Sequence, residues 1–89
     1  MFELKYSSKA KKFIKKCDEK TRNRIKEALS LISQNPYPSQ EFDFKKISGE
    51  EDTYRIRLSS HRIIYAIYHA EKTIRIIKIE RRDEHTYKF

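Results

Sequence analysis

The stretches Tyr54-Arg55-Ile56-Arg57-Leu58 and Arg62-Ile63-Ile64-Tyr65 decide the fold of this 89-residue chain. Side chains alternate between the two faces of an extended strand, so the apolar side chains of residues 54–58 face one way and Arg55 and Arg57 face the other. A turn at residues 59–61 would bring Arg62, the first residue of the next strand, close to this pair. The two stretches therefore predict a hairpin with three guanidiniums gathered on one face.

Such a cluster is expensive to hold together unless anions neutralise it. The planar guanidinium fork matches phosphate, to which it donates two parallel hydrogen bonds. The sequence therefore predicts a phosphate-binding site, and specifically a nucleic-acid site. The formal net charge of +8 and the isoelectric point near 9.7 favour a polyanionic partner in the same way.

The rest of the fold follows from hydrophobic spacing. Residues 2–6 alternate as a short half-buried strand. Two helices follow, the first capped at Ser7-Ser8 and the second at Asp18, and Asn35-Pro36 ends the second. Their apolar stripes lie at helical spacing: Ala10, Phe13, Ile14 and Cys17 in the first, and Ile25, Ala28, Leu29 and Ile32 in the second.

Residues 35–53 show no regular pattern, so we expect a long loop there. Three strands at about 54–58, 62–69 and 73–80 complete the chain. The order β-α-α-β-β-β predicts an α+β fold, in which a two-helix hairpin packs on one face of a small, mostly antiparallel sheet. His61 and His69 fall in a turn and at a strand end, where we expect solvated side chains.

We expect one domain spanning residues 1–89, since 89 residues leave no room for a second. Cys17 is the only cysteine, which suits a reducing compartment. There is no apolar signal segment and no run long enough to span a membrane, so we expect a cytoplasmic protein without membrane contact. No spacing of Cys, His and carboxylates resembles a metal site, and no cofactor is expected.

The element order, together with Tyr54-Arg55-Ile56-Arg57, Arg62-Ile63-Ile64-Tyr65 and a terminal Arg82…Tyr87, resembles the RelE/ParE superfamily of toxins. The resemblance covers essentially the whole chain and implies one RelE-like toxin domain over residues 1–89. It further implies the toxin of a type II toxin–antitoxin system: a metal-independent endoribonuclease, or messenger-RNA interferase, that cuts messenger on the ribosome and inhibits translation.

Carried across residue by residue, the resemblance assigns catalytic roles to five positions: Arg55, Arg57, Arg62, Arg82 and Tyr87. We also expect substrate-binding roles for Lys45, Lys46, Arg81 and His85. Arg81 is an alternative to Arg82 as the family's arginine after the last strand. In the best-known ribosome-dependent members the two strand positions are lysines, whereas both are arginines here.

The general base is the weak point of this site, because an arginine keeps its proton at neutral pH. Tyr87, Lys45 or Lys46, His85 and a ribosomal group are the candidates. Tyr87 could instead stack on a base, or pack the tail onto the sheet. The lysines of the first helix (Lys9, Lys11, Lys12, Lys15 and Lys16) form either a solvated face or a contact strip for ribosomal RNA phosphates.

The resemblance also implies partners: an acidic RelB-like antitoxin in a hetero-oligomer, the ribosome with messenger and ribosomal RNA, and operator DNA only as the antitoxin complex. Two alternatives share the fold. One is a ParE-like toxin directed at DNA gyrase, and the other is a non-catalytic nucleic-acid-binding module.

Overall fold

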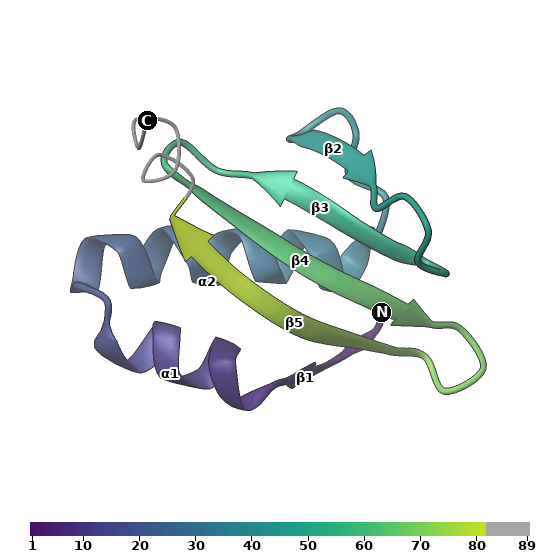
Figure 1. Ribbon diagram of the computed structural model, residues 1–89, viewed down its shortest axis with the longest axis horizontal. Coiled ribbons are helices and arrows are strands. Elements are labelled where there is room, and N and C mark those ends of the chain that lie inside the picture. The colour runs from purple at the N-terminus through teal and green to yellow at the C-terminus, as the bar shows by residue number, and fades with distance from the viewer. Residues whose placement is uncertain (82–89) are drawn as a thin grey trace.

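The computed structural model describes residues 1–81, which form two helices against one sheet (Figure 1). Strand β1 (Glu3–Tyr6) leads into helices α1 (Ser8–Lys16) and α2 (Glu19–Gln34). Four strands follow: β2 (Asp43–Lys46), β3 (Thr53–Arg57), β4 (His61–Tyr68) and β5 (Thr73–Arg81). None of the described helices is both long and apolar enough to cross a membrane.

The sheet has the order β1-β5-β4-β3-β2. Strand β1 pairs with β5 in parallel, and the other neighbours pair in antiparallel fashion. The predicted α+β class, with a helical hairpin on a mostly antiparallel sheet, is therefore confirmed.

One prediction was wrong: residues 35–53 are not an irregular loop throughout, because β2 lies within them. Strand β2 has four residues, three of them charged, so it shows almost no hydrophobic period of its own. Its pairing with β3 defines it, from Asp43 opposite Arg57 to Lys46 opposite Tyr54. Such long-range pairing is invisible to a scan of local periodicity.

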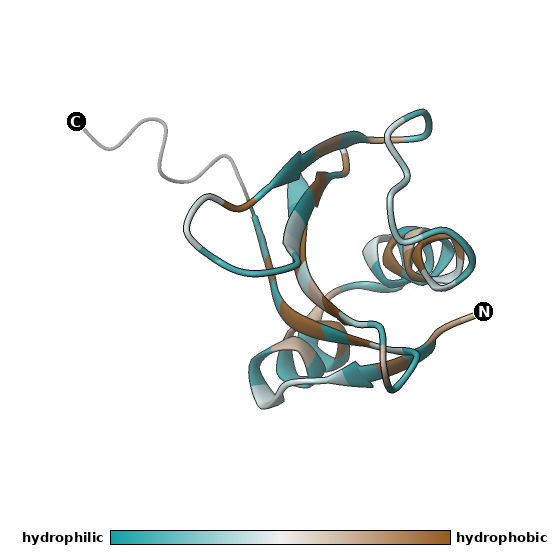
Figure 2. Cartoon of the chain, turned by 90° about the vertical axis from the view of Figure 1, so that its right-hand side faces the viewer, coloured by the Kyte–Doolittle hydropathy of each residue, from teal (hydrophilic) through white to brown (hydrophobic). Residues whose placement is uncertain are grey.

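Both helices lie on the same side of the sheet, and the apolar parts of strands and helices face each other (Figure 2). Isoleucine dominates the core between them; among the residues without measurable exposure are Ile32, Ile56, Ile63, Ile74 and Ile76. Because side chains alternate along a strand, the residues between these isoleucines point to the opposite face. We call this opposite face the open face, since no helix within residues 1–81 covers it.

The helix starts follow the predicted caps. The Ser7 hydroxyl accepts a hydrogen bond from the Ala10 amide and donates one to the carbonyl of Ile77 on β5. The Asp18 carboxylate accepts a bond from the Thr21 amide, and this bond lowers the pKa of Asp18. The Ser7 contacts fix the start of α1 against the sheet as well as capping it.

Candidate active site

A row of four charged residues crosses the open face from β2 to β5. Asp43 lies opposite Arg57, Arg57 opposite Arg62, and Arg62 opposite Glu80. Residues directly opposite each other share a face of the sheet, with side chains close enough to interact. We call these four residues the arginine row. Along it, two positively charged side chains stand between two negatively charged ones.

The two carboxylates hold the ends of the arginine row. Asp43 Oδ2 lies 3.2 Å from Arg57 Nη1, and Glu80 Oε2 lies 3.3 Å from Arg62 Nε. The other oxygen of Glu80 lies 3.3 Å from Lys78 Nζ. The predicted meeting of Arg57 and Arg62 is therefore present, but the protein itself supplies anions that the sequence reasoning missed.

A second row lies on the same face, two residues further along each strand, and adds further cations. It consists of Lys45, Arg55, Ile64 and Lys78, each opposite the next. Arg55 differs from its neighbours, because its side chain is 11% exposed, against 42% for Arg57 and 30% for Arg62. Its Nη2 lies 3.7 Å from Asp43 Oδ1. Of the three arginines predicted to cluster, Arg57 and Arg62 are thus the accessible ones, whereas Arg55 lies largely beneath the surface.

The predicted pair Lys45 and Lys46 is divided between the two faces. Lys45 pairs with Arg55 and so belongs to the open face. Lys46 pairs with Tyr54, and its Nζ lies 5.8 Å from the centre of the Tyr54 ring and donates to the carbonyl of Glu50. The structure therefore brings Lys45, and not Lys46, to the arginines.

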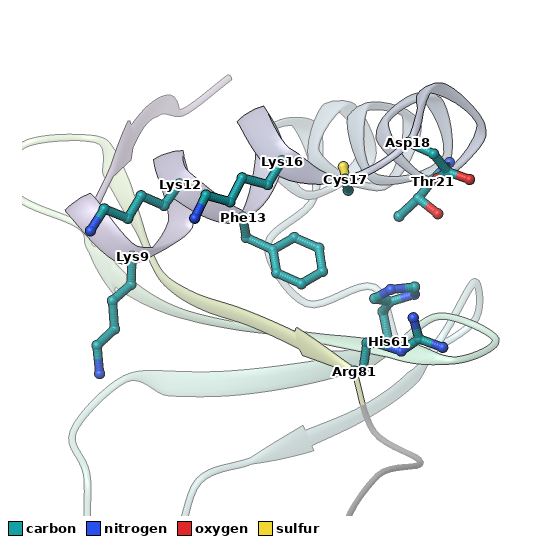
Figure 3. A pocket seen from close by; sticks show the side chains of 9 residues that line it. All are labelled: Lys9, Lys12, Phe13, Lys16, Cys17, Asp18, Thr21, His61 and Arg81. Atoms are coloured by element: carbon teal, nitrogen blue, oxygen red, sulfur yellow. The ribbon is translucent and has the colours of Figure 1, made fainter.

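Arg81 lies away from the arginine row, opposite His61 on the side of the helices. There it lines a pocket of about 630 Å³ between α1 and the end of β5 (Figure 3). The pocket also contains Lys9, Lys12, Lys16, Phe13 and His61. Its lysines come from the helix face whose role the sequence left open, so α1 and Arg81 form a second cationic region.

The prediction of a solvated side chain was wrong for His61, whereas His69 is exposed as predicted. His61 begins β4 and is buried, with its ring 5.5 Å from that of Phe13 in an edge-to-face contact. His69 is exposed, but its Nε2 lies 2.8 Å from the Tyr37 hydroxyl. Turn-like Ser59-Ser60 suggested that the turn extends to His61, whereas the pairing with Arg81 starts the strand there.

Three predicted site residues, Arg82, His85 and Tyr87, lie outside the described residues. Within residues 1–81, no three His, Cys, Asp or Glu side chains come together as a metal site. The missed residues, Asp43 and Glu80, could have been found only by combining strand register with charge. Glu80 precedes Arg81 at the end of an isoleucine-rich strand, and Asp43 stands in the segment predicted as a loop.

The chain is similar to known toxins over nearly its whole length. A family model described as the ParE toxin of the type II toxin–antitoxin system parDE matches residues 4–86. RelE1 of Methanocaldococcus jannaschii is 30% identical over 82 residues, which cover 92% of this chain and 91% of that protein.

Solved structures agree with these matches. The archaeal RelE–RelB complex from Pyrococcus horikoshii OT3 contains a chain with a TM-score of 0.82 and 27% identity, covering 93% of this chain and 97% of that one. The intact RelBE toxin–antitoxin complex of E. coli contains a chain with a TM-score of 0.79 and 22% identity, covering 91% and 96%, which shows a shared fold. The chain belongs to the RelE/ParE superfamily and is a RelE-type toxin of a type II toxin–antitoxin system.

Proposed function

We propose that this toxin is a metal-independent endoribonuclease that cuts messenger RNA on the ribosome and so inhibits translation. The observation that carries the proposal is the adjacency of Arg57 and Arg62 on a face that no helix within residues 1–81 covers. Two neighbouring guanidiniums in reach of solvent form a cradle for one phosphate group. A surface built only for solubility has no need of such a like-charged pair.

The chemistry of RNA cleavage suits this cradle. Attack of a 2′-hydroxyl on the adjacent phosphate builds a phosphorane that carries more negative charge than the starting diester. Fixed cations aimed at that charge usually provide the largest single catalytic contribution. Arg57 and Arg62 supply these cations directly. The largely buried Arg55 adds to the positive electrostatic potential of the same face.

The C-terminal residues complete the proposed site. Tyr87 would stack on an unpaired base, and Arg82 and His85 would contact the messenger beside the cut. Lys45 would bind the substrate backbone from the second row. Lys46 and Arg81 face the helix side, so we assign them to backbone contacts away from the scissile phosphate.

The pocket beside α1 supports contact with ribosomal RNA. Lys9, Lys12 and Lys16 project from one side of α1, and Arg81 faces the same pocket (Figure 3). Such a cationic strip binds phosphates without reading sequence. The open face would then hold the messenger while the α1 side holds the ribosome.

We further propose that residues 1–89 act as one domain in the cytoplasm, held inactive by an acidic RelB-like antitoxin in a hetero-oligomer. The RelE relatives from Pyrococcus horikoshii and E. coli were solved as complexes with RelB, which supports such a partner. Acidic side chains of the antitoxin would take the place of phosphate at the arginines. Operator DNA would be bound only by that complex.

A translation reaction tests this function against the gyrase alternative, which the ParE name of the matching family keeps relevant. Purified toxin is added to ribosomes translating a defined messenger, and in parallel to gyrase with supercoiled DNA. Truncated messenger with intact DNA is the expected result. Intact messenger with gyrase-dependent DNA breaks would establish the ParE-like function instead, and no effect in either reaction would indicate a non-catalytic module.

A further inference from the structure

We propose that Glu80 is the general base that takes the proton from the attacking 2′-hydroxyl. This inference rests on the proposed nuclease function and answers the question that function leaves open. The arginines cannot accept a proton near neutral pH, and protonated lysines have no acceptor to offer. On the open face the arginine row contributes two groups that can accept one, Asp43 and Glu80.

The position of Glu80 suits the role. Its carboxylate lies 3.3 Å from Arg62 Nε, beside one half of the proposed phosphate cradle. Each of its oxygens has one cationic partner at 3.3 Å, so lone pairs remain for a hydroxyl. Its side chain is 25% exposed, enough for contact with RNA but with less competing water than at Asp43, which is 49% exposed.

Asp43 has a different set of partners. Its two oxygens lie near two different arginines, Arg55 and Arg57, and it stands on the edge strand β2. Because it joins the exposed arginine to the largely buried one, we assign it the role of a positioning residue. Glu80 instead contacts a single arginine of the cradle, together with Lys78.

The proton transfer is coupled to charge stabilisation. The 2′-hydroxyl proton passes to a Glu80 oxygen as the bond from O2′ to phosphorus forms. The bond from phosphorus to O5′ then breaks, and O5′ takes a proton from water, which leaves a 2′,3′-cyclic phosphate and a 5′-hydroxyl. The hydroxide formed from that water takes the proton back from Glu80, which restores the carboxylate. Once Glu80 is neutral, Arg62 loses its counter-ion and its charge is available to the phosphorane.

Within residues 1–81, few charged groups surround Glu80. Arg62 faces it from β4 and Lys78 from its own strand, while Arg57 lies one strand further away on β3. Strand β1 pairs with β5 only from Thr73 to Ile76, so its described residues do not flank Glu80. A pH dependence that disappears with Glu80 is therefore assigned to this carboxylate together with its two cations.

The test is single-turnover cutting of ribosome-bound messenger from about pH 8 down to about pH 4, which reaches the ordinary pKa of a glutamate side chain near 4.3. Wild-type toxin should cut more slowly towards acidic pH, as the base becomes protonated. Glu80→Gln should lower the rate about 10²–10⁴-fold and flatten this acidic decline. Its affinity for a messenger with a 2′-deoxy nucleotide at the cut position should stay within a few-fold of wild type. Glu80→Asp keeps a carboxylate. It should cut more slowly than wild type, and its cutting rate should still fall towards acidic pH.

Two further variants sharpen the result. Glu71→Gln removes an exposed carboxylate from the β4–β5 turn and should behave as wild type. The cutting rate of Asp43→Asn should still fall towards acidic pH, even if this variant cuts faster or slower than wild type. The assignment is overturned if Glu80→Gln cuts within a few-fold of wild type, if it keeps the acidic decline, or if Asp43→Asn alone flattens it. Wild-type toxin that leaves messenger intact would refute the proposed function, and this assignment with it.

Discussion

Arg57 on β3 and Arg62 on β4 lie directly opposite each other on the open face of the sheet. Like charges at directly opposed positions destabilise a sheet, and here Asp43 and Glu80 close the row on both sides. The arginine row is therefore held in place by the protein's own carboxylates. At the proposed site, the same carboxylates would compete with phosphate for the two arginines and so would weaken phosphate binding.

Replacing Asp43 by asparagine should strengthen binding of a short single-stranded RNA at low salt. The substitution removes the anion shared by Arg55 and Arg57. Each further phosphate contact on a single strand steepens the slope of log affinity against log salt by about 0.7. Fluorescence anisotropy over a salt series measures both quantities.

The matched control is Glu41→Gln, which changes the net charge equally but lies in the turn before β2. It should raise affinity less than Asp43→Asn and leave the salt slope nearly unchanged. Equal effects of the two variants would mean that overall charge, and not release of the arginine row, governs binding.

Tyr65→Phe should lower the free energy of unfolding by about 1–2 kcal/mol. The Tyr65 ring is fully buried, and its hydroxyl donates a 2.8 Å hydrogen bond to the Pro36 carbonyl. This bond ties the segment after α2 to the middle of β4. Urea denaturation of the purified toxin measures the loss, and an unchanged midpoint would show that the bond contributes nothing.

The same variant should change how the free energy of unfolding depends on pH above about 10. Burial raises the pKa of Tyr65 above its usual value near 10, so the unfolded chain loses this proton before the folded one does. Wild-type stability should therefore fall as pH rises above about 10. Tyr65→Phe should fall less steeply, with the remainder coming from Tyr6 and Tyr37, whose pKa values are also raised by burial.

At the C-terminal end, Tyr87→Phe should cut messenger nearly as well as wild type, whereas Tyr87→Ala should lose activity. Stacking of a base on an aromatic ring contributes about 1–3 kcal/mol, and phenylalanine keeps the ring. Cleavage rates of the two variants on ribosome-bound messenger are compared directly. Equal loss in both would assign the role to the hydroxyl.

Much of the fold follows from local patterns. The caps at Ser7 and Asp18 and the apolar stripes of the helices were visible because they depend on neighbours within one or two turns. The gathering of Arg57 and Arg62 followed from alternation plus one short turn. These features require no knowledge of distant parts of the chain.

The missed features depend on strand register. Asp43 reaches Arg57 only because a four-residue strand pairs with β3, and Glu80 reaches Arg62 only through the pairing of β4 with β5. The separation of Lys45 from Lys46 has the same origin, since neighbours in a strand face opposite ways. The spacing of residues in the sequence predicted the arginines of the candidate site. Their counter-ions, Asp43 and Glu80, could be identified only from the strand register.

The central claim, that the arginine row binds the scissile phosphate, is tested most directly by cutting assays with Arg62→Ala. The ion pair of Arg62 with Glu80 is partly exposed, so its loss should cost about 1 kcal/mol of stability or less. Arg75→Ala is the matched control, because Arg75 is exposed on the same face, opposite Ala66 and away from the row.

Cut sites and single-turnover rates are mapped by primer extension on ribosome-bound messenger, with folding checked by circular dichroism. The account predicts that folded Arg62→Ala leaves messenger uncut while Arg75→Ala cuts at the wild-type positions and rate. Folded Arg62→Ala that cuts like wild type would contradict it.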